Sequence, residues 1–242
     1  MPDIRTLILG EKYRSFLEKP LDKHGIHCIF VPYNPHVDTR LAGHADLSVF
    51  APGDGNIFLA PYLKGSSFYT KIADFVPQIN FLDIIQDKEY PKDAQMNICS
   101  AKEHFIYRPG VSSEFLVNFL SNSGKKGIPV KQGYIKCCTC LTGEKSLISS
   151  DPGIAKACSA NGFEVLLIEN GGIVLDGFSY GFIGGSTVLV NNKLLFTGKL
   201  ENVPDKKLII NYLESKEIEP VFLTSLPLFD IGSFIPITEK QP

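Results

Sequence analysis

The chain lacks several features that would narrow its class at once. It contains no tryptophan, two methionines and five histidines in 242 residues. No apolar stretch approaches the roughly 20 residues that a membrane-spanning helix needs. The segment Met1–Gly10 also lacks the basic stretch, apolar core and cleavage site of a secretory signal. We therefore expect a cytoplasmic protein with no membrane partner.

An excess of charge of one sign is also missing. The 24 Lys and Arg residues are interspersed with 26 Asp and Glu residues, which gives a net charge of −2. Without a basic stripe, nucleic acid is not an expected partner. Six cysteines in a chain of this length do not form a small disulfide scaffold, and we expect the cluster Cys137, Cys138 and Cys140 to be reduced thiols.

What the chain does contain is a repeat. Pairs of short apolar runs joined by a turn are followed each time by a helical pattern and one more apolar run, and the ends of successive pairs are 48, 42 and 47 residues apart. A period in the forties is typical of a propeller or a solenoid. We interpret residues 1–242 as a single domain with a shared core. The four predicted hairpins are Ala45–Pro61, Asn97–Pro109, Tyr134–Asp151 and Phe182–Gly198.

The third repeat shows the predicted order of elements most clearly. Two predicted strands form a hairpin, and the second of them ends at Ser149. Asp151 can then cap a helix that has Pro152 at its first position. Gly162 supplies a left-handed residue that ends the helix. The apolar run Glu164–Ile168 then predicts a strand buried on both faces, so the unit reads strand, strand, helix, strand.

The two ends of the chain complete the pattern. Thr6–Gly10, a helix near Glu11–Glu18 and Ile26–Val31 form a unit that lacks its first strand. The tail Asp230–Ile237 has the length and the small residues of Asp46–Pro52, which begins the first hairpin. We predict that the termini pair in one unit and close a ring of five.

Two other architectures share part of this pattern. A WD40 propeller has a similar period, but it is built of strands alone and uses a Trp-Asp signature that this chain cannot supply. A doubly wound sheet also alternates strands and helices, although it has one strand per helix and normally a glycine-rich phosphate loop. Gly181–Ser186 is rich in glycine but lacks that three-glycine fingerprint. The doubly wound sheet remains the alternative to the ring.

Five units of this kind resemble the pentein fold of guanidino-group-modifying enzymes, an α/β five-bladed propeller. Locally, Gly133–Cys137, Leu166–Glu169 and Tyr180–Gly185 resemble an uncharacterised bacterial branch of that fold. The resemblance implies a small-molecule ligand in a central channel and requires no cofactor. It leaves the oligomeric state open.

The resemblance also implies a reaction. In these enzymes a Cys thiolate attacks an amidinium carbon, a His moves protons and carboxylates grip the cation. His44 and Asp46 resemble the family's His-x-Asp strand, and an extended segment would turn both toward the channel. The family's Cys lies near the C-terminus, whereas no Cys follows Cys158 here. We predict Cys137 as the nucleophile and keep Cys99 as the alternative.

The substrate-gripping element is matched less closely. Glu169-Asn170-Gly171-Gly172 resembles the family's Glu-Gly-Gly-Asp, with one residue added and with Asp176 following later. An alternative is a tight turn that leaves a strand, with Glu169 in solvent. The residues expected to bind substrate are Glu169, Asp176, Tyr180, Gly184, Gly185 and Asp230.

Metal binding is not expected from the cysteine cluster. Structural zinc sites usually use two pairs of ligands, and Cys137, Cys138 and Cys140 have no second pair. Two functional hypotheses remain. The first is a Cys-dependent hydrolase or transferase that acts on a small guanidino or amidine-bearing metabolite. The alternative is a noncatalytic ring that binds a ligand or a protein partner, which the missing C-terminal Cys favours.

Overall fold

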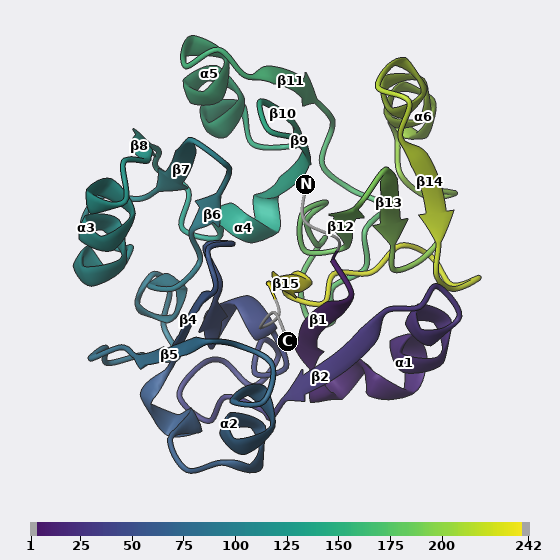
Figure 1. Ribbon diagram of the computed structural model, residues 1–242. Coiled ribbons are helices and arrows are strands. Elements are labelled where there is room, and N and C mark those ends of the chain that lie inside the picture. Colours follow the sequence, from purple (N-terminus) through teal and green to yellow (C-terminus); the bar gives the residue numbers. More distant parts are fainter. Residues whose placement is uncertain (1–3, 239–242) are drawn as a thin grey trace.

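Five three-stranded sheets, each with a helix on its outer side, form a ring (Figure 1). The computed structural model describes residues 4–238. In every sheet the middle strand pairs antiparallel with one neighbour and parallel with the other. The sheets are β15-β1-β2 (Ile235–Ile237, Thr6–Gly10, His27–Val31), β3-β4-β5 (Val49–Phe50, Asn56–Leu59, Gln78–Phe81), β6-β7-β8 (Cys99–Ser100, His104–Tyr107, Lys126–Pro129), β9-β10-β11 (Thr139–Gly143, Ser146–Ser149, Glu164–Leu167) and β12-β13-β14 (Thr187–Val190, Lys193–Phe196, Glu219–Phe222).

One helix per unit connects the middle strand to its parallel neighbour, as a parallel pair requires. Each helix turns a short apolar stripe inward, for example Leu17 and Leu21 in the first unit, which are fully buried. The five connecting helices are α1 (Arg14–Asp22), α2 (Ser67–Ile72), α3 (Glu114–Asn122), α5 (Pro152–Ala160) and α6 (Lys206–Ser215). Shorter helical turns are Glu11–Tyr13, Ala45–Leu47, Pro61–Leu63, Lys92–Ala94 and α4 (Ile135–Cys138).

The local signals of the third unit are confirmed. The Asp151 carboxylate accepts a hydrogen bond from the Ile154 amide at 2.8 Å, and Pro152 begins α5. Gly162 has a φ of +81°, the left-handed conformation that ends the helix. A capping side chain and a glycine thus set the bounds of this helix.

The prediction that the third strand is buried on both faces is wrong. Glu164 is exposed at the start of β11, and Leu167 at its end is 48% exposed. The reason is topological, because β11 lies at the edge of its sheet and pairs only with β10 among the described residues. The outermost strand of a small sheet has the helix on one side and solvent beyond its edge.

The termini close the ring as predicted. Strand β15 pairs antiparallel with β1, with Thr6 opposite Ile237 and Ile8 opposite Ile235. This sheet completes the fifth unit. The doubly wound alternative is excluded, because the described residues form five separate sheets with three strands for each connecting helix.

The apolar cores lie between successive units as well as within them. One core joins Ile8 and Val31 of the first unit to Ile57 and Phe68 of the second. Another joins Ile106 of β7 to residues of the β9-β10-β11 unit. Because each unit buries the apolar face of its neighbour, the ring holds together as a repeat array does.

Three histidines in polar or turn-rich sequence, His24, His27 and His36, are exposed. Within residues 4–238 no helix is both long and apolar enough to cross a bilayer.

Candidate active site

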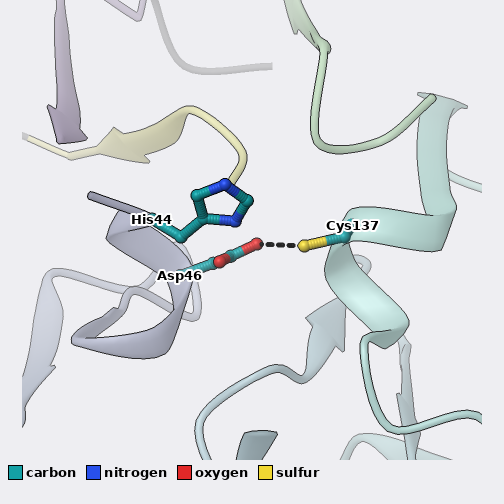
Figure 2. A group of neighbouring side chains, drawn as sticks. All are labelled: His44, Asp46 and Cys137. Atoms are coloured by element: carbon teal, nitrogen blue, oxygen red, sulfur yellow. Dashed lines mark hydrogen bonds between the residues drawn. The ribbon is translucent and has the colours of Figure 1, made fainter. Parts of the chain in front are cut away.

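Three predicted side chains from distant parts of the chain meet near the centre of the ring (Figure 2). His44 and Asp46 come from the helical turn ahead of β3, and Cys137 comes from α4, ahead of β9. Each lies shortly before the first strand of its unit. Since the first strands surround the axis of the ring, the segments that lead into them converge there.

The local conformation around these residues differs from the prediction. The sequence predicts extended strands through His44–Asp46 and through Cys137, whereas both Asp46 and Cys137 lie on helical turns. Strand residues need a paired neighbour to satisfy their backbone groups. Pairing of β9 with β10 ends at Thr139, so the residues before it close a helical hydrogen bond instead, from the Cys138 amide to the Tyr134 carbonyl at 2.9 Å.

The Cys137 thiol donates a hydrogen bond to a buried carboxylate. Its Sγ lies 2.9 Å from Oδ2 of Asp46, which also accepts a hydrogen bond from the Ser233 hydroxyl at 2.8 Å. On the other side, the Asn97 side-chain amide lies 3.6 Å from the same sulfur. The sulfur is therefore held between two polar side chains.

Two buried polar atoms in this cluster have no partner in the structure. They are Nε2 of His44 and Oδ1 of Asp46, in side chains that are 3% and 1% exposed. A buried polar atom without a partner costs free energy, which a protein tolerates chiefly where the atom has a functional partner. Nε2 of His44 can therefore donate or accept a hydrogen bond with a ligand, and Oδ1 of Asp46 can accept one.

The surroundings of Cys137 favour the neutral thiol. Burial raises its pKa well above the ordinary value, and the negative charges of Asp46 and Asp230 raise it further. The free protein therefore holds Cys137 as a protonated hydrogen-bond donor at neutral pH. A cation bound beside the two carboxylates would remove much of that repulsion and make the thiolate accessible.

Asp230 is the second carboxylate of the cluster. It accepts backbone N–H hydrogen bonds from Phe182 and Gly232, both at 2.9 Å. Burial raises its pKa, while the charge of His44 acts in the opposite direction. Gly185 allows this carboxylate its position, because a Cβ atom there would lie 2.0 Å from Oδ1 of Asp230.

A cavity of about 280 Å³ opens onto this cluster. Its polar lining residues are His44, Cys137, Ser179 and Asp230. The remaining lining residues are aliphatic or aromatic, namely Leu41, Tyr134, Leu175, Phe178, Tyr180 and Phe182. A second cavity of about 720 Å³ is lined largely by the first strands and includes Asp46. Asp46 thus borders the larger cavity and contacts the sulfur that lines the smaller one.

Several predicted site residues are brought to the smaller cavity and others are not. Tyr180 and Asp230 line it. Glu169 is exposed, lines neither cavity, and has its backbone N–H bonded to Asp205, so the alternative of a tight turn with a solvated Glu169 describes this segment. Asp176 is 76% exposed in its side chain and pairs with Lys12 at 3.4 Å.

The two glycines do not line the cavities. Gly184 allows close packing, since a Cβ atom there would lie 2.3 Å from the Thr139 carbonyl oxygen. Gly185 donates its amide to the Cys137 carbonyl at 2.8 Å. Their role is to let the chain before β12 approach α4 and Asp230.

Sequence reasoning missed the residues that hold the sulfur in place. Oδ1 of Asn97 accepts hydrogen bonds from the amides of Lys136 and Cys137, at 2.7 and 3.4 Å. Ser233, with a φ of +65°, reaches Asp46 from the other end of the chain. A signal was available, because both are polar residues placed shortly before the first strand of a unit, as Asp46 and Cys137 are.

Cys99 does not share this environment. It is buried in an apolar core with Ile106 and Ile128 and does not line the smaller cavity. Cys137 is the one cysteine among the residues that line that cavity. The geometry distinguishes the two predicted nucleophile candidates in favour of Cys137.

The same three residues form the one group within residues 4–238 that could hold a metal ion. Single ligand atoms of His44, Asp46 and Cys137 lie within 4.8 Å of one another. Nitrogen, oxygen and thiolate sulfur are donors that Zn²⁺ accepts, provided that the thiol loses its proton. The cysteine cluster itself supplies only one of the three donors.

A family model matches residues 8–235, and its description is a family of unknown function, DUF6873. The chain belongs to DUF6873. No curated protein matches this DUF6873 chain in sequence.

Solved structures match it over nearly the whole chain. Agmatine deiminase from C. jejuni with bound substrate has a TM-score of 0.60 at 10% identity, covering 98% of this chain and 95% of that one. DDAH from Pseudomonas aeruginosa complexed with citrulline has 0.52 at 11%, with 95% and 92% covered. The inosamine-phosphate amidinotransferase StrB1 from Streptomyces griseus has 0.53 at 9%, with 99% and 95% covered.

These similarities, with the five mixed sheets, show that this DUF6873 protein has the pentein fold. The predicted five-unit ring of strand-strand-helix-strand units is confirmed. At identities of 8–13% the likeness concerns the fold, and the chemistry has to be argued from the residues of this chain.

Proposed function

We propose that the protein is a Cys-dependent hydrolase or transferase that acts on the guanidino or amidine carbon of a small cationic molecule. The observation that carries the proposal is the contact between the Cys137 thiol and the buried Asp46 carboxylate, at 2.9 Å, beside His44. The sulfur also lines a cavity of about 280 Å³. A nucleophile, a proton carrier and the Asp230 carboxylate therefore line one cavity, and the Asp46 carboxylate contacts the nucleophile.

The carboxylates suit a guanidinium or an amidinium group. Its planar N–H groups match the geometry of a carboxylate and form charge-assisted hydrogen bonds. No Lys or Arg of residues 4–238 forms an ion pair with Asp46 or Asp230 in the structure. Two buried acids without a Lys or Arg partner form an electrostatic site for a cation from outside.

The proposed reaction has two stages, attack by the thiol with loss of an amine and then release of the covalent intermediate. Sγ of Cys137 forms a bond to the amidinium carbon, and the thiol proton passes to Asp46 or His44. The carbon–nitrogen bond to the leaving amine breaks, and His44 supplies the proton with which the amine departs. Water, or the amine of a second substrate, then attacks the carbon, and His44 takes the released proton. The carbon–sulfur bond breaks, and a proton returns to the sulfur from His44 or Asp46 to restore the thiol.

The test is amidine-directed labelling of Cys137. The reagent 2-chloroacetamidine carries the cation and an electrophilic carbon, and 2-chloroacetamide is the neutral control of nearly the same size. We expect the amidine to label Cys137 much faster than the amide does, as measured by peptide mass spectrometry across pH 5 to 9. The other five cysteines should show no such preference.

A noncatalytic ligand-binding ring is the second candidate, and the raised pKa of Cys137 favours it. The same experiment separates the two functions. Equal, slow labelling of Cys137 by both reagents would mean that bound cations do not activate the thiol. A separate assay measures ammonia or amine released from a panel of guanidines. Release by the parent protein that is absent in Cys137→Ala would show turnover.

A further inference from the structure

The wall opposite the polar cluster is aromatic. Phe178, Tyr180 and Phe182 come from the segment that leads into β12, and the rings of Tyr180 and Phe182 meet edge to face with centroids 6.0 Å apart. Phe178 and Tyr180 are 40% and 37% exposed, unusually open for large aromatic side chains. Tyr134, which directly precedes α4, also lines the cavity, so aromatic side chains line it from two segments of the chain.

Among residues 4–238, no Lys and no Arg lines this cavity. Arg40 is the cation next to its aromatic wall, with its guanidinium 4.4 Å from the centre of the Phe178 ring. Asp38 binds that guanidinium through two contacts, at 2.6 and 3.0 Å, and the carbonyl of Gly177 accepts a third hydrogen bond at 3.1 Å. Arg40 is thus already neutralised.

The second cation near this region is neutralised as well. Lys12 pairs with Asp176 at 3.4 Å and lies 5.5 Å from the centre of the Tyr13 ring. The structure therefore presents the Asp230 carboxylate in the cavity lining and, among residues 4–238, no unpaired Lys or Arg beside it. A substrate with its own carboxylate, such as a free amino acid, would lose the hydration of that group and gain no charged partner.

The size of the cavity limits the substrate further. A volume of about 280 Å³ falls just below the usual range for drug-sized ligands. It suits a cationic head with one ring or a short chain, and it does not suit a peptide. Aromatic faces also attract the edge of a cationic group and stack against a planar one.

Resting on the proposed function, we propose that the substrate is a small guanidine or amidine whose tail is aromatic or apolar and carries no carboxylate. Phe178 and Tyr180 are the residues that select the tail, and Asp230 receives the cationic head. These molecules are the class of substrate that the cavity lined by Cys137 would bind.

The experiment compares matched ligands by isothermal titration calorimetry with the Cys137→Ala protein, which cannot turn them over. The probes are phenylguanidine, 4-guanidinobenzoate, which adds only a carboxylate, and the simple guanidinium ion. We expect phenylguanidine to bind at least tenfold more tightly than either of the others. Phe178→Ala should reduce its affinity severalfold and leave guanidinium binding unchanged. Phe115→Ala, an exposed phenylalanine on α3, is the control and should change neither.

A gain of function gives the sharpest result. Tyr180→Arg places a cation at the wall and should raise the affinity for 4-guanidinobenzoate while lowering the preference for phenylguanidine. Equal binding of the two aromatic guanidines by the parent protein would overturn the substrate class, but amidine-directed labelling of Cys137 would still support the proposed function. Absence of binding by all three probes, together with equal labelling by the amidine and the amide, would overturn both.

Discussion

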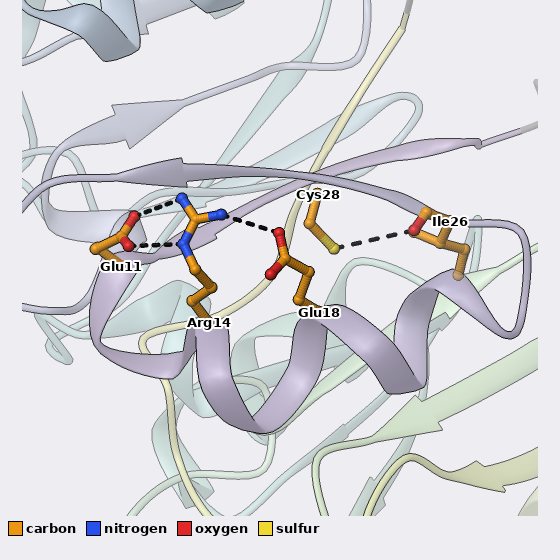
Figure 3. Close-up of polar contacts among 5 residues, drawn as sticks. All are labelled: Glu11, Arg14, Glu18, Ile26 and Cys28. Atoms are coloured by element: carbon orange, nitrogen blue, oxygen red, sulfur yellow. Dashed lines mark hydrogen bonds and ion pairs between the residues drawn. The ribbon is translucent and has the colours of Figure 1, made fainter.

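Carboxylates at the centre of the ring and beside α1 differ in whether an arginine pairs with them. On α1, Arg14 binds Glu11 through two parallel contacts, Nε to Oε1 at 2.6 Å and Nη2 to Oε2 at 2.8 Å, and reaches Glu18 with its third nitrogen (Figure 3). These hydrogen bonds lower the pKa of Glu11. In the centre, burial raises the pKa of Asp230, and no arginine among the described residues pairs with its carboxylate.

The difference teaches what the central site lacks. A guanidinium beside a carboxylate is the arrangement that Arg14 of α1 completes with Glu11 of the preceding helical turn. The central cluster has the carboxylates, a thiol and an imidazole, but its cationic partner would have to come from a ligand. The α1 network is therefore an internal control for the central site, and four predictions test the contrast.

The largest effect is expected at the sulfur. Cys137→Ala should abolish amidine-directed labelling at that position and reduce any turnover more than about 10³-fold, because Cys137 supplies the one thiol among the described residues that line the cavity. The control is Cys28→Ala on β2, beside α1, where burial raises the thiol pKa to about 12 and the Ile26 carbonyl lies 4.0 Å from the sulfur. Turnover that survives in Cys137→Ala would refute the assignment of the nucleophile.

The next effect is expected at Asp230. Asp230→Asn removes the charge that receives the cation and should weaken guanidinium binding about 10- to 100-fold, the worth of a hydrogen bond to a charged group. In the parent protein, affinity should fall as the pH decreases through the pKa of Asp230, because the protonated acid no longer attracts a cation. That pKa is raised, so the loss should begin above the pH at which an ordinary aspartate titrates. Calorimetry between pH 4 and 8 would measure it, and a pH-independent affinity would contradict the assignment.

A smaller effect is expected at Asp46. Its charge raises the pKa of Cys137, so Asp46→Asn should lower that pKa and increase the fraction of thiolate at pH 8. Each unit of pKa corresponds to about a tenfold change in that fraction. The alkylation rate of Cys137 by 2-chloroacetamide, without any ligand, is the measurement. An unchanged or slower rate would mean that the Asp46 carboxylate does not hold the thiol in its neutral form.

The smallest effect is expected on α1. Arg14→Gln should lower the free energy of unfolding by about 0.2–1 kcal/mol at neutral pH, the usual range for exposed ion pairs. The pKa of Glu11 is lower in the folded protein than in the unfolded one, so its contribution is present above the unfolded value and is lost as the pH falls through the folded one. Urea titrations at pH 7 and at a pH below both values should show the difference and then its disappearance. A difference that persists in acid would assign it to packing of Arg14 on Phe30, where the guanidinium lies 4.0 Å from the ring.

The fold was accessible from the sequence because its signals are local and repeated. Asp151, Pro152 and Gly162 mark the helix of one unit, and four hairpins at similar spacing reveal the period. Where the prediction was wrong, the signal was not local. The apolar run Glu164–Ile168 reads as fully buried, yet β11 lies at the edge of its sheet, and sheet order is set by contacts between distant segments.

The candidate site divides in the same way. His44, Asp46, Cys137, Tyr180 and Asp230 could be proposed from residue type, short spacing and family resemblance. Glu169 could be proposed on the same grounds, but the chain carries it away from the cavity. Asn97 and Ser233 carry the same positional signal, a polar residue shortly before a first strand, but only the structure shows that they reach Cys137 and Asp46.

By itself, the sequence determined the five units, their order and the pairing of the two ends, because periodic apolar residues, caps and glycines act over a few residues at a time. Only the tertiary structure decided which cysteine meets a carboxylate, which acids remain without a cation and which aromatic rings line the cavity. Those properties depend on burial and on distances between residues far apart in the chain, from Asp46 to Cys137 and from Asp46 to Ser233, which no local pattern records.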